Sequence, residues 1–170
     1  MDFQLTLQEP EDWGATFSPC GLYRPHLWRV WEPSLPRLAF LMLNPSTADE
    51  NADDPTVRRC NKWARAWGYG RLDVINLFDV RATDPQVMLR SEAPCSPGND
   101  AVILEVSSAA DCLVCAWGNH GRHHGRGESI RRRLRAHGIA PHALALNRET
   151  GEPAHPLYLR SSVTPSICLI

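Results

Sequence analysis

Two asparagines and a histidine stand where this sequence could bind a ligand. Asn44, Asn76 and His155 each lie at or after the end of an apolar run. An asparagine amide donates and accepts hydrogen bonds, so Asn44 can hold a water, a sugar hydroxyl or a base edge, but it cannot remove a proton. Asn76 interrupts an apolar segment, where a neutral polar side chain needs a partner or a ligand. These residues predict a binding site whose two asparagines cannot accept a proton.

A carboxylate would have to serve as the general base of such a site. The segment between Asn44 and the next helix contains Asp49, Asp53 and Asp54. Any of the three could serve as the base; we favour Asp49 or Asp53, because Asp54 directly precedes Pro55 and is better placed to cap the helix. The same segment supplies further expected substrate-binding residues: Pro45, Ser46 and Thr47. Asn-Pro and Ser-Thr are also frequent in turns, so the motif alone does not separate the two interpretations.

A glycine-rich segment, GNHGRHHGRG at residues 118–127, follows the third apolar run. Glycines let backbone N–H groups approach a phosphate, and the segment leads into a helix, so we expect an anion-binding loop. The residues expected to bind substrate here are Trp117, Asn119, His120 and Arg122. Zinc is an alternative, but the three histidines lie on one loop without a convincing further ligand. We therefore expect no metal and no cofactor.

The charged residues are unevenly distributed. The net charge is −1, which argues against a strong nonspecific grip on nucleic acid, yet residues 1–54 hold 9 acidic side chains against 3 arginines. The remainder is net positive, which permits a basic face. Arg81 either pairs with Asp79 or Asp84 or binds a phosphate. The four arginines within residues 131–135 spread around a helix and are expected to form a solvated face.

Four apolar runs alternate with helical segments and must position these side chains. The runs cover about 37–44, 72–78, 112–117 and 142–146, and the helices about 55–67, 84–88, 99–111 and 128–137. This alternation predicts an α/β fold of three layers, α/β/α, with a four-stranded parallel sheet. Because the carboxyl ends of parallel strands meet at one edge, we expect the polar residues after all four runs to line a single pocket.

The whole chain, residues 1–170, is expected to form a single domain with 43% hydrophobic residues. It would comprise an N-terminal β-hairpin at about 13–32, the α/β core at about 37–160 and a C-terminal tail at 161–170. No segment approaches the ~20 apolar residues that span a bilayer, and the six cysteines resemble reduced, buried thiols. We expect a cytoplasmic protein without membrane attachment or an obligate protein partner.

Several motifs together resemble a known family. They are LNPSTAD (43–49), DPTVRRC (54–60), WGYG (67–70), NLFDVRATDP (76–85), AWGNHG (116–121) and HPLYL (155–159). On these motifs the chain resembles an uncharacterised bacterial family, domain of unknown function 1643, over about residues 15–160. That resemblance implies no activity.

The order of the motifs also resembles, more distantly, the uracil-DNA glycosylase superfamily. Asn44-Pro45 is similar to its water-positioning motif, and Asn76 to its base-reading asparagine. The segment 117–120 is similar to its WGxH motif, and His155-Pro156 to its final loop, which places Leu159 where those enzymes carry a residue that enters the duplex. The resemblance implies a uracil-DNA glycosylase-like fold.

That resemblance also implies a mechanism. A flipped base would be read by Asn76, water would be held at Asn44, and His155 would stabilise charge on the departing base. Leu159 would fill the vacated stack. The partner would be a nucleobase, a nucleotide or DNA.

The sequence departs from the superfamily pattern in three respects. Position 44 lacks the aspartate of the most active members, HPLYL lacks the usual serine and second proline, and no cysteine set for an iron–sulfur cluster is present. Either the reaction is slow, or Asp49 or Asp53 replaces the missing group, or the pocket binds without cutting. Three hypotheses follow: an N-glycosidase acting on a modified or unmodified nucleobase, a noncatalytic nucleotide or nucleic-acid binding module, and a metal-dependent phosphohydrolase.

Overall fold

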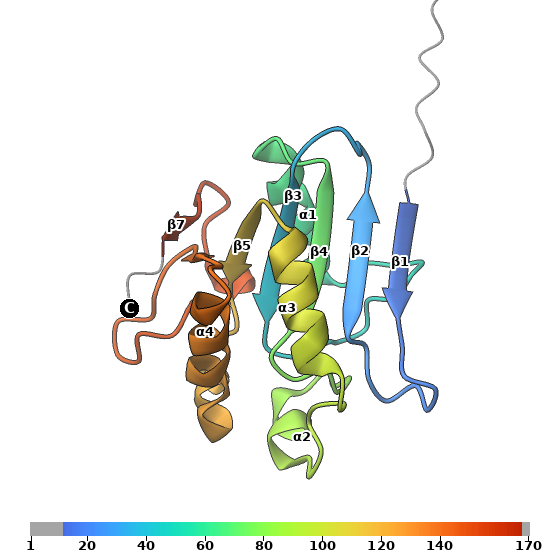
Figure 1. The fold of residues 1–170 in the computed structure, drawn as a ribbon, viewed down its shortest axis with the longest axis vertical. Coiled ribbons are helices and arrows are strands. Elements are labelled where there is room, and N and C mark those ends of the chain that lie inside the picture. The colour runs from blue at the N-terminus through green and yellow to red at the C-terminus, as the bar shows by residue number, and fades with distance from the viewer. Residues whose placement is uncertain (1–11, 168–170) are drawn as a thin grey trace, which may run out of the picture.

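The computed structural model describes residues 12–167, which form a mixed α/β fold around one sheet (Figure 1). The sheet has seven strands in the order β1-β2-β4-β3-β5-β6-β7. Their bounds are β1 (Asp12–Thr16), β2 (His26–Val30), β3 (Arg37–Met42), β4 (Arg71–Asn76), β5 (Cys112–Cys115), β6 (Pro141–Ala143) and β7 (Ser166–Ile167). The predicted α/β class is confirmed, and the sheet is larger than the four strands expected.

The centre of the sheet is built on β3. This strand pairs in parallel with β4 on one side and with β5 on the other, and β5 pairs in parallel with β6. Four consecutive residues of β3, from Leu38 to Leu41, are 0% exposed. A strand with neighbours on both edges and helices on both faces has no solvent side, which explains its uninterrupted apolar sequence.

The two ends of the chain extend the sheet with antiparallel strands. β2 pairs with β1 and also with β4, where Leu27 lies opposite Val74, so the N-terminal hairpin continues the sheet. At the other edge β7 pairs with β6. The predicted C-terminal tail is held at another point too, because the indole Nε1 of Trp63 donates to the carbonyl of Ser161 at 2.9 Å. Residues 168–170 lie outside the described residues.

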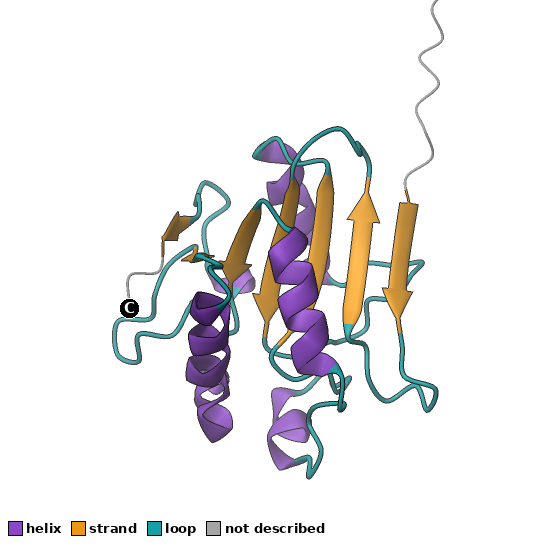
Figure 2. Cartoon of the chain, in the orientation of Figure 1, coloured by secondary structure: helices purple, strands orange, loops and turns teal. Residues whose placement is uncertain are grey.

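Helices cover both faces of the sheet (Figure 2). The helices are α1 (Pro55–Ala66), α2 (Pro85–Arg90), α3 (Asn99–Ala109) and α4 (Arg126–Ala136), and two 3-10 helices are η1 (Asn119–Gly125) and η2 (Pro156–Tyr158). α1 packs with Trp63 against the β3 face that carries Phe40. α3 and α4 pack on the opposite face, where Ile103 and Ile130 join Leu41. Alternate residues of one strand therefore contribute to two separate cores.

The start of α1 is the one predicted. The Asp54 side chain accepts a hydrogen bond from the Val57 N–H at 2.9 Å, and Pro55 occupies the first helical position. α1 is the first helix after β3 in the chain. The cap therefore fixes the position at which the chain enters the first turn of α1.

No helix within residues 12–167 is long and apolar enough to cross a membrane. The cysteines of that range are all free thiols: Cys20, Cys60, Cys95, Cys112 and Cys115. Cys168 lies outside the described residues.

Candidate functional site

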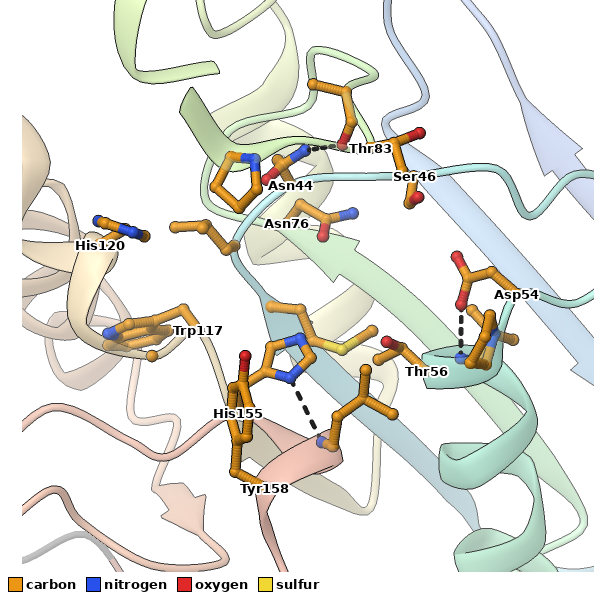
Figure 3. Close-up of a pocket in the computed structure, with 18 of the residues that line it drawn as sticks. Asn44, Ser46, Asp54, Thr56, Asn76, Thr83, Trp117, His120, His155 and Tyr158 are labelled. Carbon is orange, nitrogen blue, oxygen red and sulfur yellow. Dashed lines mark hydrogen bonds between the residues drawn. The ribbon is translucent and has the colours of Figure 1, made fainter. Parts of the chain in front are cut away.

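A cavity of about 490 Å³ opens at the carboxyl ends of β3, β4 and β5 (Figure 3). Its wall is completed by the first turn of α1 and by the segment around η2. The structure brings these predicted site residues to it: Asn44, Ser46, Asn76, Trp117, Asn119, His120 and His155. A volume of this size is typical of a small-molecule site. Segments more than a hundred residues apart in the sequence thus share one cavity.

Asn76 lies at the inner end of the cavity and is 1% exposed. Neither Nδ2 nor Oδ1 of its side chain has a hydrogen-bond partner among the described residues. The backbone around it is fixed, because the Asn99 Nδ2 donates to the carbonyls of Asn76 and Leu77 at 3.1 Å each. An unpaired buried polar group costs about 1–3 kcal/mol, so a rigidly held amide with two unused groups is suited to a ligand with a complementary edge.

Asn44 has one end of its amide engaged. Its Nδ2 donates to the carbonyls of Ala82 at 2.8 Å and Pro45 at 3.0 Å. These two acceptors fix the orientation of the amide, which leaves Oδ1 as an acceptor beside the cavity. The geometry agrees with the interpretation of Asn44 as a group that can hold water or a hydroxyl.

His155 is held as a neutral hydrogen-bond donor. The Leu157 N–H donates to its Nδ1 at 3.3 Å, so in the neutral ring the proton is on Nε2. Burial lowers the pKa of His155, and the opposing effect of the Asp54 charge is smaller. Figure 3 shows the ring at the cavity wall with the second nitrogen on the side toward Asn76. A neutral imidazole can therefore present an N–H to a ligand acceptor in this cavity.

Asp54 is the carboxylate that lines the cavity among the described residues. Its Oδ1 accepts the helix-capping hydrogen bond from Val57, and Figure 3 shows the second oxygen directed away from α1, on the side of Ser46 and Asn76. Asp54 is 7% exposed. The preferred role of Asp54 as a helix cap is confirmed, and the cap does not exclude a second role, because one carboxylate provides two oxygens.

Asp49 and Asp53, the predicted bases, do not line the cavity. The carboxylate of Asp49 accepts hydrogen bonds from the backbone N–H groups of Asn51 and Ala52, which lower its pKa. Asp53 pairs with Arg29 at 2.8 Å, and both side chains are buried. These carboxylates stabilise the loop between β3 and α1, and sequence position alone could not separate them from Asp54.

Five predicted binding residues also lie outside the cavity lining: Pro45, Thr47, Arg81, Arg122 and Leu159. The Arg81 guanidinium donates to the carbonyl of Gly21 at 3.2 Å and lies over the Phe17 ring, so it does not make the predicted contact with the site. Leu159 packs against the core formed with α1. The exposed side chains of this segment are instead Tyr158, at 87%, and Leu157, at 43%, and both line the cavity.

The glycine-rich segment has a packing role that the anion-loop hypothesis did not include. It forms η1, and a Cβ on Gly121 would lie 2.0 Å from Cδ1 of Trp117. Trp117 is fixed in turn, because its Nε1 donates to Glu152 at 2.5 Å and Glu152 pairs with Arg131 at 2.9 Å. The buried network of Trp117, Glu152 and Arg131 therefore fixes the part of the cavity wall that carries His120. Asn119 is already engaged, since its Oδ1 accepts from Asn147 and Thr150.

Arg24 is a cavity residue that the sequence did not reveal. It is 1% exposed, and its Nη1 donates to the carbonyl of Ala48 at 2.5 Å. Burial lowers its pKa to about 10, with the nearby Asp54 opposing that shift, so Arg24 remains charged at neutral pH. The one available signal was a basic residue beside the apolar strand β2. Three further lining residues that were not predicted as site residues, Thr56, Thr83 and Tyr158, lie within motifs that were recognised.

Within residues 12–167, no group of three or more His, Cys, Asp or Glu side chains is arranged to hold a metal ion. The rings of His123 and His124 contact each other in a tilted arrangement, with 3.8 Å between their centroids. The polar groups around the cavity are suited to hydrogen bonding with an organic ligand.

Comparison with known proteins gives one match. A family model described as "Protein of unknown function (DUF1643)" matches residues 24–157, which include every cavity-lining residue except Tyr158. Neither a curated protein nor a solved structure matches the chain.

Proposed function

The chain belongs to the DUF1643 family of proteins of unknown function, and we propose that its cavity binds a nucleobase and hydrolyses the N-glycosidic bond that joins the base to a sugar. The observation that carries the proposal is the buried, unpaired amide of Asn76 in the same cavity as a neutral His155. The finer proposal for the fold is a uracil-DNA glycosylase-like core, consisting of β4, β3, β5 and β6 with helices on both faces. The parallel pairings of these strands support it.

Asn76 selects the kind of ligand. Its two amide groups match an edge that offers one donor and one acceptor side by side, which lactam and amidine edges of nucleobases do. A ligand of this kind would satisfy both groups and remove the cost of their burial. A purely apolar ligand would leave that cost in place.

His155 supplies the chemistry at the departing base. When the C–N bond breaks, the electron pair remains on the base and negative charge develops on its ring and exocyclic oxygens. A neutral Nε2–H donor stabilises that charge as it forms. Burial lowers the pKa of His155 and so favours the neutral ring at neutral pH. The ring can therefore act as a neutral donor directly.

Asn44 and the cavity rim complete the proposed site. With Nδ2 committed to Ala82 and Pro45, the Oδ1 of Asn44 can orient a water molecule. Tyr158 lies exposed at the rim beside His155, with 5.8 Å between the ring centroids. An exposed aromatic ring can stack on a neighbouring base, which favours a base within an oligonucleotide over a free nucleoside.

The test is release of free base from oligonucleotides that contain uracil, hypoxanthine or a hypermodified base, and from the corresponding nucleosides, measured by chromatography. We expect Asn76→Ala and His155→Ala to reduce release by about 100-fold or more, the loss seen when a stabilising donor is removed. Asn61→Ala and His142→Ala are matched controls, because both residues are at least partly buried but lie outside the cavity lining.

Two outcomes would change the proposal. Binding of a base or nucleotide without turnover, lost in Asn76→Ala, would establish the noncatalytic binding module instead. Equal base release by wild type and both cavity variants would overturn the proposed site. The phosphohydrolase has less support, because two of the carboxylates available to it, Asp49 and Asp53, are engaged away from the cavity.

A further inference from the structure

We propose that Asp54 is the catalytic carboxylate of this site and accepts the proton of the water that attacks the sugar. The inference rests on the proposed N-glycosidase function and supplies what the sequence lacks at position 44. Asn44 can orient water but cannot take its proton. Asn76 cannot accept a proton either, and His155 presents its Nε2–H while its Nδ1 already accepts from the Leu157 N–H, so these three residues alone leave the site without a base.

Elimination identifies Asp54 among the described residues. It is the acidic side chain in the cavity lining. Asp49 and Asp53, the other acidic side chains of the same segment, are engaged with backbone N–H groups and with Arg29. A proton acceptor must lie within hydrogen-bond reach of the reacting water or one water away, and of these three carboxylates only Asp54 lines the cavity that would hold that water.

The two oxygens of the Asp54 carboxylate have different roles. Oδ1 accepts the N–H of Val57 and so anchors the carboxylate to the first turn of α1. No hydrogen bond between described residues uses Oδ2, and Figure 3 shows this oxygen directed away from the helix. The cap therefore fixes the side chain in one rotamer and leaves an acceptor beside the cavity. A preorganised base of this kind needs no rearrangement when substrate binds.

A second and independent feature, the unpaired amide of Asn76, supports a ligand site beside the N-terminus of α1. The Asn76 amide lines the same cavity, is 1% exposed and lacks partners for both of its polar groups. The cavity therefore has an unpaired recognition group and an unpaired carboxylate oxygen together. Arg24, in the same lining, provides the positive charge that makes a buried carboxylate tolerable there.

The proposed step balances as a simple hydrolysis. The water oxygen forms a bond to the anomeric carbon while the bond from that carbon to the base nitrogen breaks, and the electron pair leaves with the base. One water proton passes to Oδ2 of Asp54. The base leaves with its negative charge stabilised by His155 and Asn76, and it is protonated by Asp54 or by solvent. The negative carboxylate also stabilises the positive charge that develops on the sugar.

The experiment compares variants that keep the helix cap but remove the base. Asparagine and serine are both good N-cap residues, so Asp54→Asn and Asp54→Ser retain the hydrogen bond to Val57. We expect each to lower the turnover number for base release by about 100-fold or more, the range of general base catalysis. Binding of the free base should change by less than about 3-fold, because Asn76 and His155 remain.

Formate provides a readout that a structural role would not change. Asp54→Ser leaves space where the carboxylate was, and we expect added formate to restore part of its activity while leaving wild type and His155→Ala unaffected. Asp84→Asn is the matched control, because Asp84 caps α2 in the same way with its carboxylate on the Gln86 N–H at 2.9 Å but lies outside the cavity lining. Thermal unfolding of all variants shows whether each one is folded.

The outcomes separate this inference from the function on which it rests. Turnover by Asp54→Asn within about 3-fold of wild type would overturn the role of Asp54 and leave the N-glycosidase proposal intact. Absence of base release by wild type from every substrate would overturn both. Loss of activity without rescue by formate, together with equal loss of base binding, would assign Asp54 to the structure of the cavity and overturn the catalytic role.

Discussion

Two polar regions lie on either side of the loop between β3 and α1, and they treat their buried groups in opposite ways. In the first, Arg29 is 0% exposed and its guanidinium donates to the Asp53 carboxylate and to the carbonyls of Asp49, Trp28 and Gly14. In the second, the cavity, Asn76 is equally buried and has no partner for either amide group among the described residues.

The difference shows which buried polar residues serve folding. A fully paired cluster gains from its hydrogen bonds and holds the loop in place, whereas an unpaired amide lowers stability and is useful only when a ligand completes it. We therefore refer to Arg29 and Asp53 as the closed cluster and to the cavity around Asn76 as the open cluster. Removal of the buried polar side chain should therefore lower the free energy of unfolding in the closed cluster and raise it in the open cluster.

The largest expected effect comes from breaking the closed cluster. Arg29→Met removes the cation and leaves the Asp53 carboxylate buried without its partner, which should lower the free energy of unfolding by about 3–5 kcal/mol. Urea unfolding followed by circular dichroism measures the change. Arg132→Met is the control, because Arg132 is exposed and lies on α4, away from this loop. A loss below about 1 kcal/mol would mean that the closed cluster does not hold the loop.

Asn76→Leu sharpens the comparison with a change of the opposite sign. Leucine is close to asparagine in size and has no polar group to leave unpaired, so we expect the free energy of unfolding to rise by about 1 kcal/mol while nucleobase binding is lost. The same urea titration and a binding assay measure both. A fall in stability would indicate that the amide has a structural partner, such as a bound water, and belongs to the closed type.

The smallest expected effect is the dependence of stability on pH through His155. Burial lowers the pKa of this ring in the folded protein relative to its usual value near 6.5, so the unfolded chain binds the proton more readily. Above pH 6.5 the ring is neutral in both states, and His155 does not lower the free energy of unfolding. As the pH falls below 6.5 toward the folded pKa, the unfolded chain binds the proton first, and the free energy of unfolding decreases. We expect wild type to lose more stability between pH 7.5 and pH 5 than His155→Gln, measured by thermal unfolding. Equal losses in the two proteins would show that the environment of His155 does not disfavour its charged form.

Local patterns in the sequence predicted the elements well because short-range chemistry sets them. The apolar run of β3 reflects burial on both faces, and the Asp54-Pro55 pair marks the start of α1 as predicted. Asn44, Asn76 and Trp117, which lie at the ends of three strands, line one cavity, and His155 lines it too. The rule that carboxyl ends of parallel strands meet at one edge required no knowledge of side-chain contacts.

The individual roles within that edge were harder to predict. Asp49, Asp53 and Asp54 are the same residue type within six positions, yet one binds backbone, one pairs with Arg29 and one lines the cavity. Leu159 and Tyr158 are adjacent, yet the first packs partly buried against the core and the second is exposed at the rim. No local pattern distinguishes these cases.

The sequence by itself determined the α/β class, the start of the first helix and the edge of the sheet at which a site should lie. Only the tertiary structure decided which carboxylate lines the cavity, that Arg24 joins it, and that Asn76 is left without a partner. The physical reason is that helix caps and apolar periodicity depend on residues a few positions apart. The pairing of a buried charge or amide depends on groups that the fold brings together from distant parts of the chain.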